Sequence, residues 1–269
     1  MVNIKIQDSI FNHVEYSTLF NKSSKMKWDR TPYSIDDIVI FTDNNLKSVN
    51  LNIKTKIAWL LESPVITKSS YEWIANNYDK FDLILTFDKD LLDLNDKFKL
   101  NPVGGCWIKP EDHLIYDKTK NISIISSDKN FTIGHKLRHD VIKNCKGLEI
   151  YGRGFNNIEY KLDGLKDYRF SVAIENTKKD YYFTEKLIDC FMTGTIPIYY
   201  GCPSINDFFD NRGIIQIDSY LDLNNIINTL NENKYNEVFE YVKINFEKAK
   251  KYLISEDNIY NTLKKLQII

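Results

Sequence analysis

Several features are absent from this chain, and each absence excludes a class of protein. No segment approaches the ~20 uninterrupted apolar residues that a membrane-spanning helix needs,. The N-terminus, Met-Val-Asn-Ile-Lys-Ile-Gln-Asp, has no apolar signal-peptide core,. There is no Gly-x-x-x-x-Gly-Lys-Ser/Thr loop and no Gly-x-Gly-x-x-Gly run, which argues against an ordinary nucleoside triphosphatase or dinucleotide enzyme,. No internal repeat is present either.

Cysteine and net charge are also low. The four cysteines show no metal-ligand spacing, so a reduced, cytoplasmic protein is the simpler interpretation; they are Cys106, Cys145, Cys190 and Cys202. The formal net charge is −1 over 269 residues, which argues against a nucleic-acid partner bound by whole-surface charge,. The 43% hydrophobic and 27% charged residues are those of a globular protein,.

Apolar strands and helical segments alternate twice along the chain. In the first series we expect strands at Val2–Ile6, Asp36–Thr42, Lys56–Leu61 and Asp82–Phe87, with a helix at Ser69–Tyr78,. In the second series we expect strands at Ile122–Ser126, Leu148–Tyr151, Tyr168–Ile174 and Ile214–Ile217, with a helix at Gly134–Cys145. Such alternation is typical of an α/β protein with mostly parallel sheets covered by helices.

A polar stretch separates the two series and predicts the domain boundary. Lys109 to Lys120 is almost wholly polar and follows a turn-rich passage,. We therefore expect an N-terminal domain at 1–118, a C-terminal domain at 119–245, and helices at 246–269 that pack back on the first domain. The two doubly wound domains are expected to face each other across a cleft, with ligands beyond the carboxyl ends of the strands.

The most informative stretch runs from Ser171 to Gly201. Thr184 can cap a helix, and Gly194 suits its left-handed C-terminal position,. Lys186 adds a positive charge to the first turn, where the helix dipole attracts anions such as phosphate. Glu185 beside it can accept hydrogen bonds from sugar hydroxyls. The alternative is an ordinary capped helix with an acid and a base in its first turn.

Three other groups of residues have both a functional and a structural interpretation. Arg138 can bind a phosphate through two parallel hydrogen bonds, or it can be a surface helix arginine. His135 and His139 are spaced like a zinc pair, but the His-Glu-x-x-His pattern is absent,. Asp88-Lys-Asp90 follows a strand and can hold Mg²⁺ or Mn²⁺, although acids favour the first turn of any helix.

Three sequence motifs resemble those of glycosyltransferase family 10, the α-1,3/4-fucosyltransferases. They are Ala173-Ile-Glu-Asn-Thr177, Tyr182-Phe-Thr-Glu-Lys-Leu-Ile188 and Gly194-Thr-Ile-Pro-Ile-Tyr-Tyr-Gly201, in the family's order and spacing. Ser126-Ser-Asp-Lys-Asn130 and Arg138 look like the family's strand turn and helix arginine. The strong similarity covers about Ile122 to Asn211, and the N-terminal half is similar only in plan.

The resemblance implies a GT-B architecture of two Rossmann-like domains and transfer of fucose from GDP-fucose with inversion, in glycan biosynthesis or protein glycosylation. By position, Arg138 and Lys186 would neutralise the diphosphate, and Glu185 would bind hydroxyls of the donor. Asn176 and Tyr182 would line the nucleotide and fucose pocket. A basic helix start can stabilise the leaving diphosphate without a metal, so no cofactor is expected, although a divalent ion at Asp88 and Asp90 stays open.

The family's general base looks like a glutamate at the end of an N-terminal strand. Glu62, after Ala58-Trp-Leu-Leu61, fits that place, and it would contribute about 10²–10⁴-fold to the rate,. The sequence departs from better-known bacterial members because Ser-Pro, and not Asn, follows this glutamate. Glu15 and Glu72 are weaker candidates, and Glu62 can also simply cap a loop.

Several alternatives remain open at this point. One is a GT-B transferase for another nucleotide sugar, and another is a non-catalytic module that binds sugar nucleotides. A metal-dependent GT-A transferase built on Asp88 and Asp90 would lose activity in EDTA. The acceptor is expected to be a glycan or glycoconjugate held by N-terminal loops such as Ser9 to Tyr33. The final helices leave peripheral membrane contact open, although packing within the chain is favoured.

Overall fold

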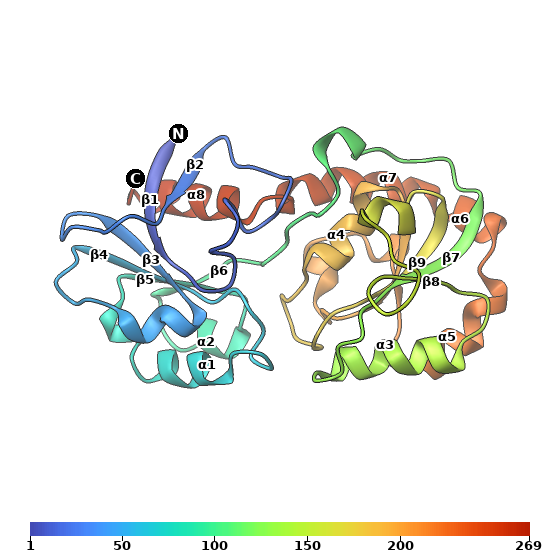
Figure 1. The fold of residues 1–269 in the computed structure, drawn as a ribbon, viewed down its shortest axis with the longest axis horizontal. Coiled ribbons are helices and arrows are strands. Elements are labelled where there is room, and N and C mark those ends of the chain that lie inside the picture. The colour runs from blue at the N-terminus through green and yellow to red at the C-terminus, as the bar shows by residue number, and fades with distance from the viewer. The chain divides into compact units, whose positions relative to one another are not determined.

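The computed structural model describes residues 1–269 and divides into two compact units (Figure 1). Unit 1 consists of Met1–Val103, Asp180–Tyr182 and Ile254–Ile269. Unit 2 consists of Gly104–Lys179 and Phe183–Leu253. Each unit is built around one parallel β-sheet, which confirms the α/β fold expected from the alternating pattern.

The sheet of unit 1 has six strands in the order β2-β1-β3-β4-β5-β6, and all neighbours are parallel. The strands are β1 (Val2–Gln7), β2 (Met26–Asp29), β3 (Ile38–Thr42), β4 (Thr55–Trp59), β5 (Leu83–Thr86) and β6 (Phe98–Leu100). The expected strands correspond to β1, β3, β4 and β5. The sequence analysis missed β2 and β6 because one is a short edge strand in a polar segment and the other has only three residues.

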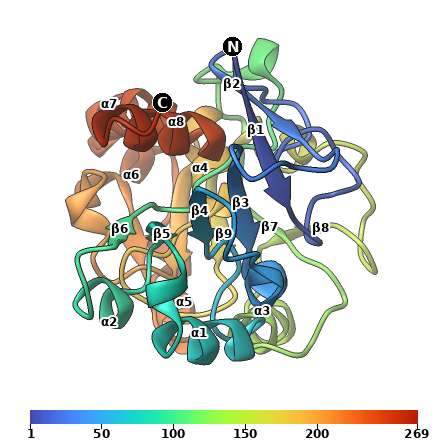
Figure 2. The same cartoon turned by 90° about the vertical axis from the view of Figure 1, so that its left-hand side faces the viewer.

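Neighbouring residues of these strands pack on opposite faces of the sheet, as the two-residue period of a strand requires. Phe41 and Ile84 face the cluster that includes α1 (Lys68–Ala75), near which the short α2 (Lys89–Leu92) also lies. Ile40 and Leu85 face the cluster that holds Ile259 and Leu263 of α8 (Ser255–Lys265). Figure 2 shows α8 beside β1 and β2. The last helix therefore completes the core of unit 1.

The sheet of unit 2 has five parallel strands in the order β11-β10-β9-β7-β8. The strands are β7 (Lys120–Ile125), β8 (Glu149–Tyr151), β9 (Tyr168–Ile174), β10 (Ile196–Tyr200) and β11 (Ile215–Gln216). The chain starts at β7, moves to β8 on one side, and then continues through β9, β10 and β11 on the other. The order thus reverses between β7 and β9, and ligands of such sheets bind at the carboxyl ends of the strands at this switch point.

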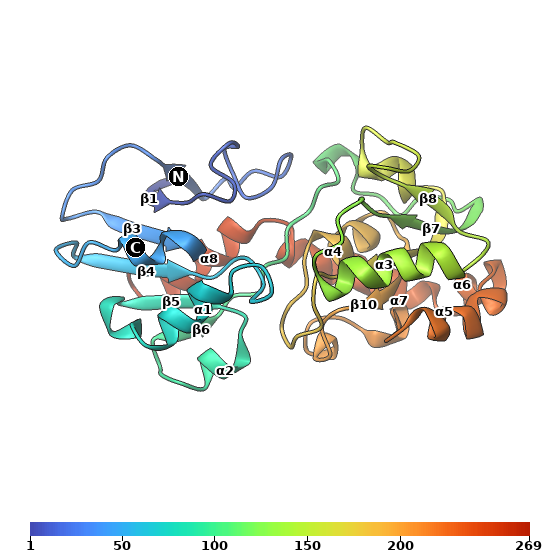
Figure 3. The same cartoon turned by 60° about the horizontal axis from the view of Figure 1, so that its bottom comes forward.

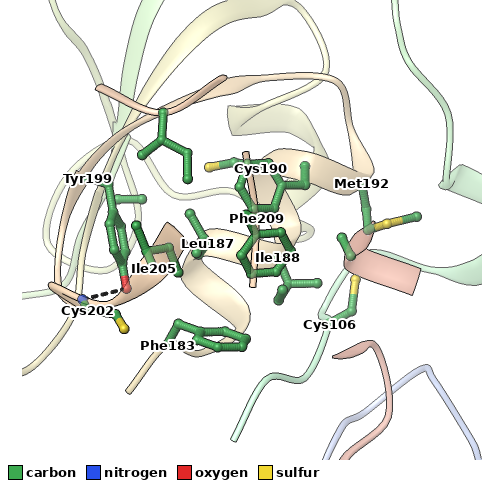
Figure 4. Close-up of a cluster of buried hydrophobic side chains, with 14 of the residues drawn as sticks. Cys106, Phe183, Leu187, Ile188, Cys190, Met192, Tyr199, Cys202, Ile205 and Phe209 are labelled. Atoms are coloured by element: carbon green, nitrogen blue, oxygen red, sulfur yellow. Dashed lines mark hydrogen bonds between the residues drawn. The ribbon is translucent and has the colours of Figure 1, made fainter. Parts of the chain in front are cut away.

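Helices cover both faces of the unit 2 sheet. Residues of α3 (Ile133–Asn144) and α5 (Tyr220–Ile226) share one apolar cluster, and Figure 3 shows the two helices side by side. On the other face, α4 (Glu185–Met192) buries an apolar stripe made of Leu187, Ile188, Phe191 and Met192. Figure 4 shows Leu187, Ile188 and Met192 in the cluster that also holds Phe183 and Tyr199. This packing fixes the start of α4 at the carboxyl edge of the sheet.

The observed boundary differs from the one expected at residue 118. Cys106 and Ile108 are buried in the core of unit 2, and the Gly105 amide donates to the Tyr252 carbonyl at 2.7 Å. The Leu114 amide likewise donates to the Met192 carbonyl, so the polar segment lies along unit 2. The segment belongs to unit 2 because burial of its apolar residues, such as Cys106 and Ile108, stabilises this placement although most of the segment is polar.

The C-terminal helices also differ from expectation in their bounds. The chain forms α6 (Glu232–Glu237) and α7 (Phe239–Ala249), and only α8 belongs to unit 1. Asn245 of α7 is buried, and its side chain bonds both the amide and the carbonyl of Asp210 in unit 2, at 2.7 and 2.9 Å. None of the helices combines the length and apolar character needed to cross a membrane.

Candidate functional site

A cavity of about 210 Å³ lies at the switch point of the unit 2 sheet. Its walls come from the ends of β7 and β9, from α3 and α4, and from a short 3₁₀ turn at Lys161–Gly164. The charged side chains in these walls are Arg138, Lys161, Glu185, Lys186 and Asp189. The cavity therefore presents both cations and carboxylates at the position where this fold class binds its ligands.

The start of α4 is fixed by a buried carboxylate from the end of β9. Glu175 is fully buried, and it accepts hydrogen bonds from the Thr184 amide at 2.8 Å and the Thr184 hydroxyl at 2.7 Å. The Thr184 hydroxyl in turn accepts from the Lys186 amide, so Thr184 is the predicted N-cap. Gly194, with φ of 70°, has the predicted left-handed conformation after the helix. The caps expected from the sequence are confirmed.

Lys186 lies over this buried carboxylate. Its ammonium nitrogen is 3.1 Å from the Thr184 hydroxyl, 3.2 Å from Glu185 Oε1 and 3.6 Å from Glu175 Oε2. Burial raises the pKa of Glu175, while the charge of Lys186 opposes that rise. The lysine is thus held at the first turn of α4, where the helix dipole also favours an anion.

A second lysine contacts the carboxylates on the other side of the cavity. Lys161 Nζ is 3.3 Å from Glu185 Oε1 and 3.0 Å from Asp189 Oδ2. Burial would raise the pKa of Glu185, but the charges of Lys186 and Lys161 outweigh it and hold that pKa below its ordinary range. Glu185 is consequently an ionised acceptor in the cavity wall.

Arg138 projects from α3 to the end of β9. Its guanidinium donates to the Ile174 carbonyl, with Nε at 3.0 Å, and to Asn176 Oδ1 at 3.1 Å. The close approach of the two elements needs Gly134, because a Cβ there would lie 1.8 Å from the Glu175 carbonyl oxygen. The structure therefore brings Arg138, Asn176, Glu185 and Lys186 together in unit 2, with three of the four in the cavity wall.

Tyr182 lies elsewhere. It belongs to the Asp180–Tyr182 segment of unit 1, where it is buried and its ring centroid is 4.8 Å from that of Phe87. Tyr182 does not line the unit 2 cavity. The sequence motif could not predict this separation, because Tyr182 is only two residues from Thr184. Its role toward a donor stays a prediction.

Glu62 lies in unit 1, three residues beyond the end of β4, because this strand ends at Trp59 and not at the expected Leu61. Its loop is held by the buried Asp43, whose carboxylate accepts from the amides of Leu61 and Glu62 at 3.2 Å each. The Tyr71 hydroxyl donates to the Glu62 carbonyl at 2.6 Å. The backbone of Glu62 is thus positioned by Asp43, which directly follows β3, and by Tyr71 of α1, and its half-buried side chain stays the candidate for the base.

The Asp43 carboxyl predicts an unusual pH dependence of stability. Burial raises its pKa to about 8, whereas an unfolded aspartate has a pKa of about 3.9,. The folded protein then binds more protons between these values, so the free energy of unfolding should fall as the pH rises from 5 to 8. Urea unfolding at each pH should show this fall in the wild type and a flatter profile in Asp43→Asn. The exposed Asp36→Asn is the control, and equal slopes in all three would contradict the prediction.

The Asp-x-Asp sequence forms a helix cap. Asp88 Oδ1 accepts from the amides of Asp90 and Leu91 at 3.0 and 3.2 Å at the start of α2. His135 forms a capping box with Thr132 at the start of α3 and His139 contacts the Lys129 carbonyl, so both histidines have structural partners. Asp88 and Asp90 thus lie at a helix start, which was the structural alternative to metal binding for this pair.

Sequence reasoning did not select Glu175, Lys161 or Asp189. Glu175 stands next to Asn176 in the motif Ala173-Ile-Glu-Asn-Thr177. Its position at the end of a predicted strand could have identified it as a site residue. Lys161 lies in a segment without any motif, and only the tertiary fold brings it to α4. Asp189 is one helical turn beyond Glu185, and its burial to 1% exposure beside a lysine cannot be read from the pattern alone.

Solved structures identify the class of the fold. An α1,3-fucosyltransferase with GDP matches with a TM-score of 0.56 and 15% identity, over 97% of this chain and 90% of that one. Staphylococcus aureus TarM, solved with UDP, matches with a TM-score of 0.58 and 15% identity, over 84% of this chain and 55% of that one. Two parallel sheets and a charged cavity at the switch point of the second, with this likeness, define a GT-B fold.

The particular family follows from the sequence comparison. The C-terminal domain of glycosyltransferase family 10 (fucosyltransferase) matches residues 115–265, more than half of the chain. The chain belongs to this family. The Helicobacter pylori alpha-(1,3)-fucosyltransferase FucT is 30% identical over 108 residues, which are 40% of this chain and 20% of that protein. Drosophila melanogaster alpha-(1,3)-fucosyltransferase B is 35% identical over 39% of this chain and 21% of its own length.

Proposed function

We propose that this protein transfers fucose from GDP-fucose to a hydroxyl of a glycan acceptor with inversion at the anomeric carbon. The observation that carries the proposal is the placement of Arg138, Glu185 and Lys186 around one cavity in a family 10 fold. A sugar diphosphate needs cations for its phosphates and an acceptor for its hydroxyls. The start of α4 supports the proposal because it offers both groups side by side: Lys186 is a cation for a phosphate, and Glu185, in contact with it, is an acceptor for a hydroxyl.

The proposed reaction follows from charge. The acceptor hydroxyl attacks the anomeric carbon on the face opposite the diphosphate, and the bond from that carbon to the phosphate oxygen breaks. Its electron pair stays on GDP, where Lys186, Arg138 and the N-terminus of α4 stabilise the growing negative charge. Glu62 accepts the proton of the hydroxyl. No metal is required in this scheme, because fixed cations supply the neutralisation.

A thermal-shift screen tests the donor. A ligand at 100 times its dissociation constant adds about 2.7 kcal/mol to the free energy of unfolding, so GDP-fucose should raise the melting temperature more than UDP- or CMP-sugars. The shift and the transfer activity should both persist in EDTA. A larger rise in melting temperature with another nucleotide sugar would favour the alternative function, a GT-B transferase that uses that sugar nucleotide as its donor. Binding without any transfer would favour the non-catalytic module.

A further inference from the structure

Lys161 is the one residue that links the two acidic side chains of α4 from outside the helix. It begins the 3₁₀ turn Lys161–Gly164, which follows β8 in the chain, and a quarter of its side chain is exposed. Its ammonium nitrogen contacts Glu185 Oε1 and Asp189 Oδ2 at 3.3 and 3.0 Å. The indole ring of Trp107 lies 5.1 Å from the same nitrogen.

Asp189 is held from both sides. It is buried, Oδ1 accepts from the Trp107 amide at 2.7 Å, and Oδ2 contacts Lys161. Asp189 therefore anchors the lysine, since a buried carboxylate is stable as an anion when it is paired and hydrogen-bonded. The anchored ammonium group then reaches Glu185 one turn earlier on α4.

Glu185 is contacted by two lysines at one oxygen. Lys161 and Lys186 both lie within 3.3 Å of Oε1. Opposite charges on both sides restrict the rotation of the carboxylate and favour its ionised form. An ionised, oriented carboxylate is the acceptor that a sugar hydroxyl needs.

We propose that Lys161 is a positioning residue for the donor, which orients the Glu185 carboxylate toward hydroxyls of a nucleoside-diphosphate sugar. This inference rests on the proposed function, and it assigns a role to a residue outside the three sequence motifs that resemble the family. Lys161 acts through Glu185 and not as a phosphate ligand. Its removal should therefore weaken binding of the hydroxyl-bearing donor more than binding of a bare diphosphate.

Calorimetric titration of GDP-fucose and of inorganic pyrophosphate tests this role. In Lys161→Met the dissociation constant for GDP-fucose should rise about 10-fold or more, the usual effect of losing a hydrogen bond to a charged group. Pyrophosphate binding should change little, because it depends on Lys186 and Arg138. Lys161→Arg should keep near wild-type donor affinity. Lys166→Met removes the same charge from a lysine of the following turn that pairs with Asp163, and it is the matched control.

A purely structural role predicts a different pattern. Lys161→Met leaves Asp189 buried without its cation, so the double variant Lys161→Met/Asp189→Asn separates stability from binding. We expect the double variant to regain melting temperature while donor affinity stays low. Recovery of donor affinity with stability, or equal losses for pyrophosphate and GDP-fucose, would overturn the positioning role. Absence of GDP-fucose binding by the wild type would overturn the proposed donor itself.

Discussion

Lys186→Ala is expected to lower kcat/KM for transfer by about 10²–10³-fold, as removal of one preorganised group that stabilises developing charge does in other enzymes. The ammonium group lies at the first turn of α4, where its charge and the helix dipole act on the same anion,. The measurement is the initial rate of GDP release at saturating acceptor over a range of donor concentrations. Lys186→Arg should retain part of the activity, because the charge stays in place.

The control for Lys186 is Lys136→Ala, which removes an exposed lysine of α3 two residues from Arg138. Both variants lose one positive charge near the same sheet edge. Glu175 keeps its two bonds from Thr184 in Lys186→Ala, so the helix start should stay formed. Circular dichroism and melting temperature check this. Wild-type rates in a folded Lys186→Ala protein would remove the central claim about the donor site.

Glu62→Gln should lower kcat by about 10²–10⁴-fold while GDP-fucose binding stays unchanged, because a general base acts on the acceptor proton and not on the donor. The amide keeps the size of the side chain, and the backbone bonds of residue 62 to Asp43 and Tyr71 are retained. In the wild type, the rate should fall at low pH as the base is protonated. The variant should lose this limb of the pH profile.

Two other glutamates serve as matched controls for Glu62. Glu15 and Glu72 are the alternative candidates from the sequence, and their side chains form exposed ion pairs with Lys22 and Lys68. Glu15→Gln and Glu72→Gln should therefore leave kcat close to the wild-type value. A large loss in either of them with an active Glu62→Gln enzyme would move the base to that residue.

Local patterns predicted the elements whose residues repeat clearly. The apolar strands of both series, the cap at Thr184 and the end of α4 at Gly194 follow from periodicity and from the special conformations of capping residues. Short elements without a period, such as β2 and β6, were missed. The domain boundary at residue 118 was also wrong by the structure, because Cys106 and Ile108 carry the segment into the core of unit 2.

The sequence by itself determined the α/β class, the family, and the adjacent Glu185 and Lys186 at a helix start, because these depend on neighbours in the chain. The tertiary structure alone decided which distant residues join them. Pairing of β7 with β9 creates the switch point of the sheet, and Gly134 lets α3 approach the end of β9. Lys161, in the turn that follows β8 in the chain, contacts Glu185 of α4. Tyr182, close to Thr184 in sequence, is instead buried in unit 1. Long-range burial and ion pairing decide such placements, and no local pattern encodes them.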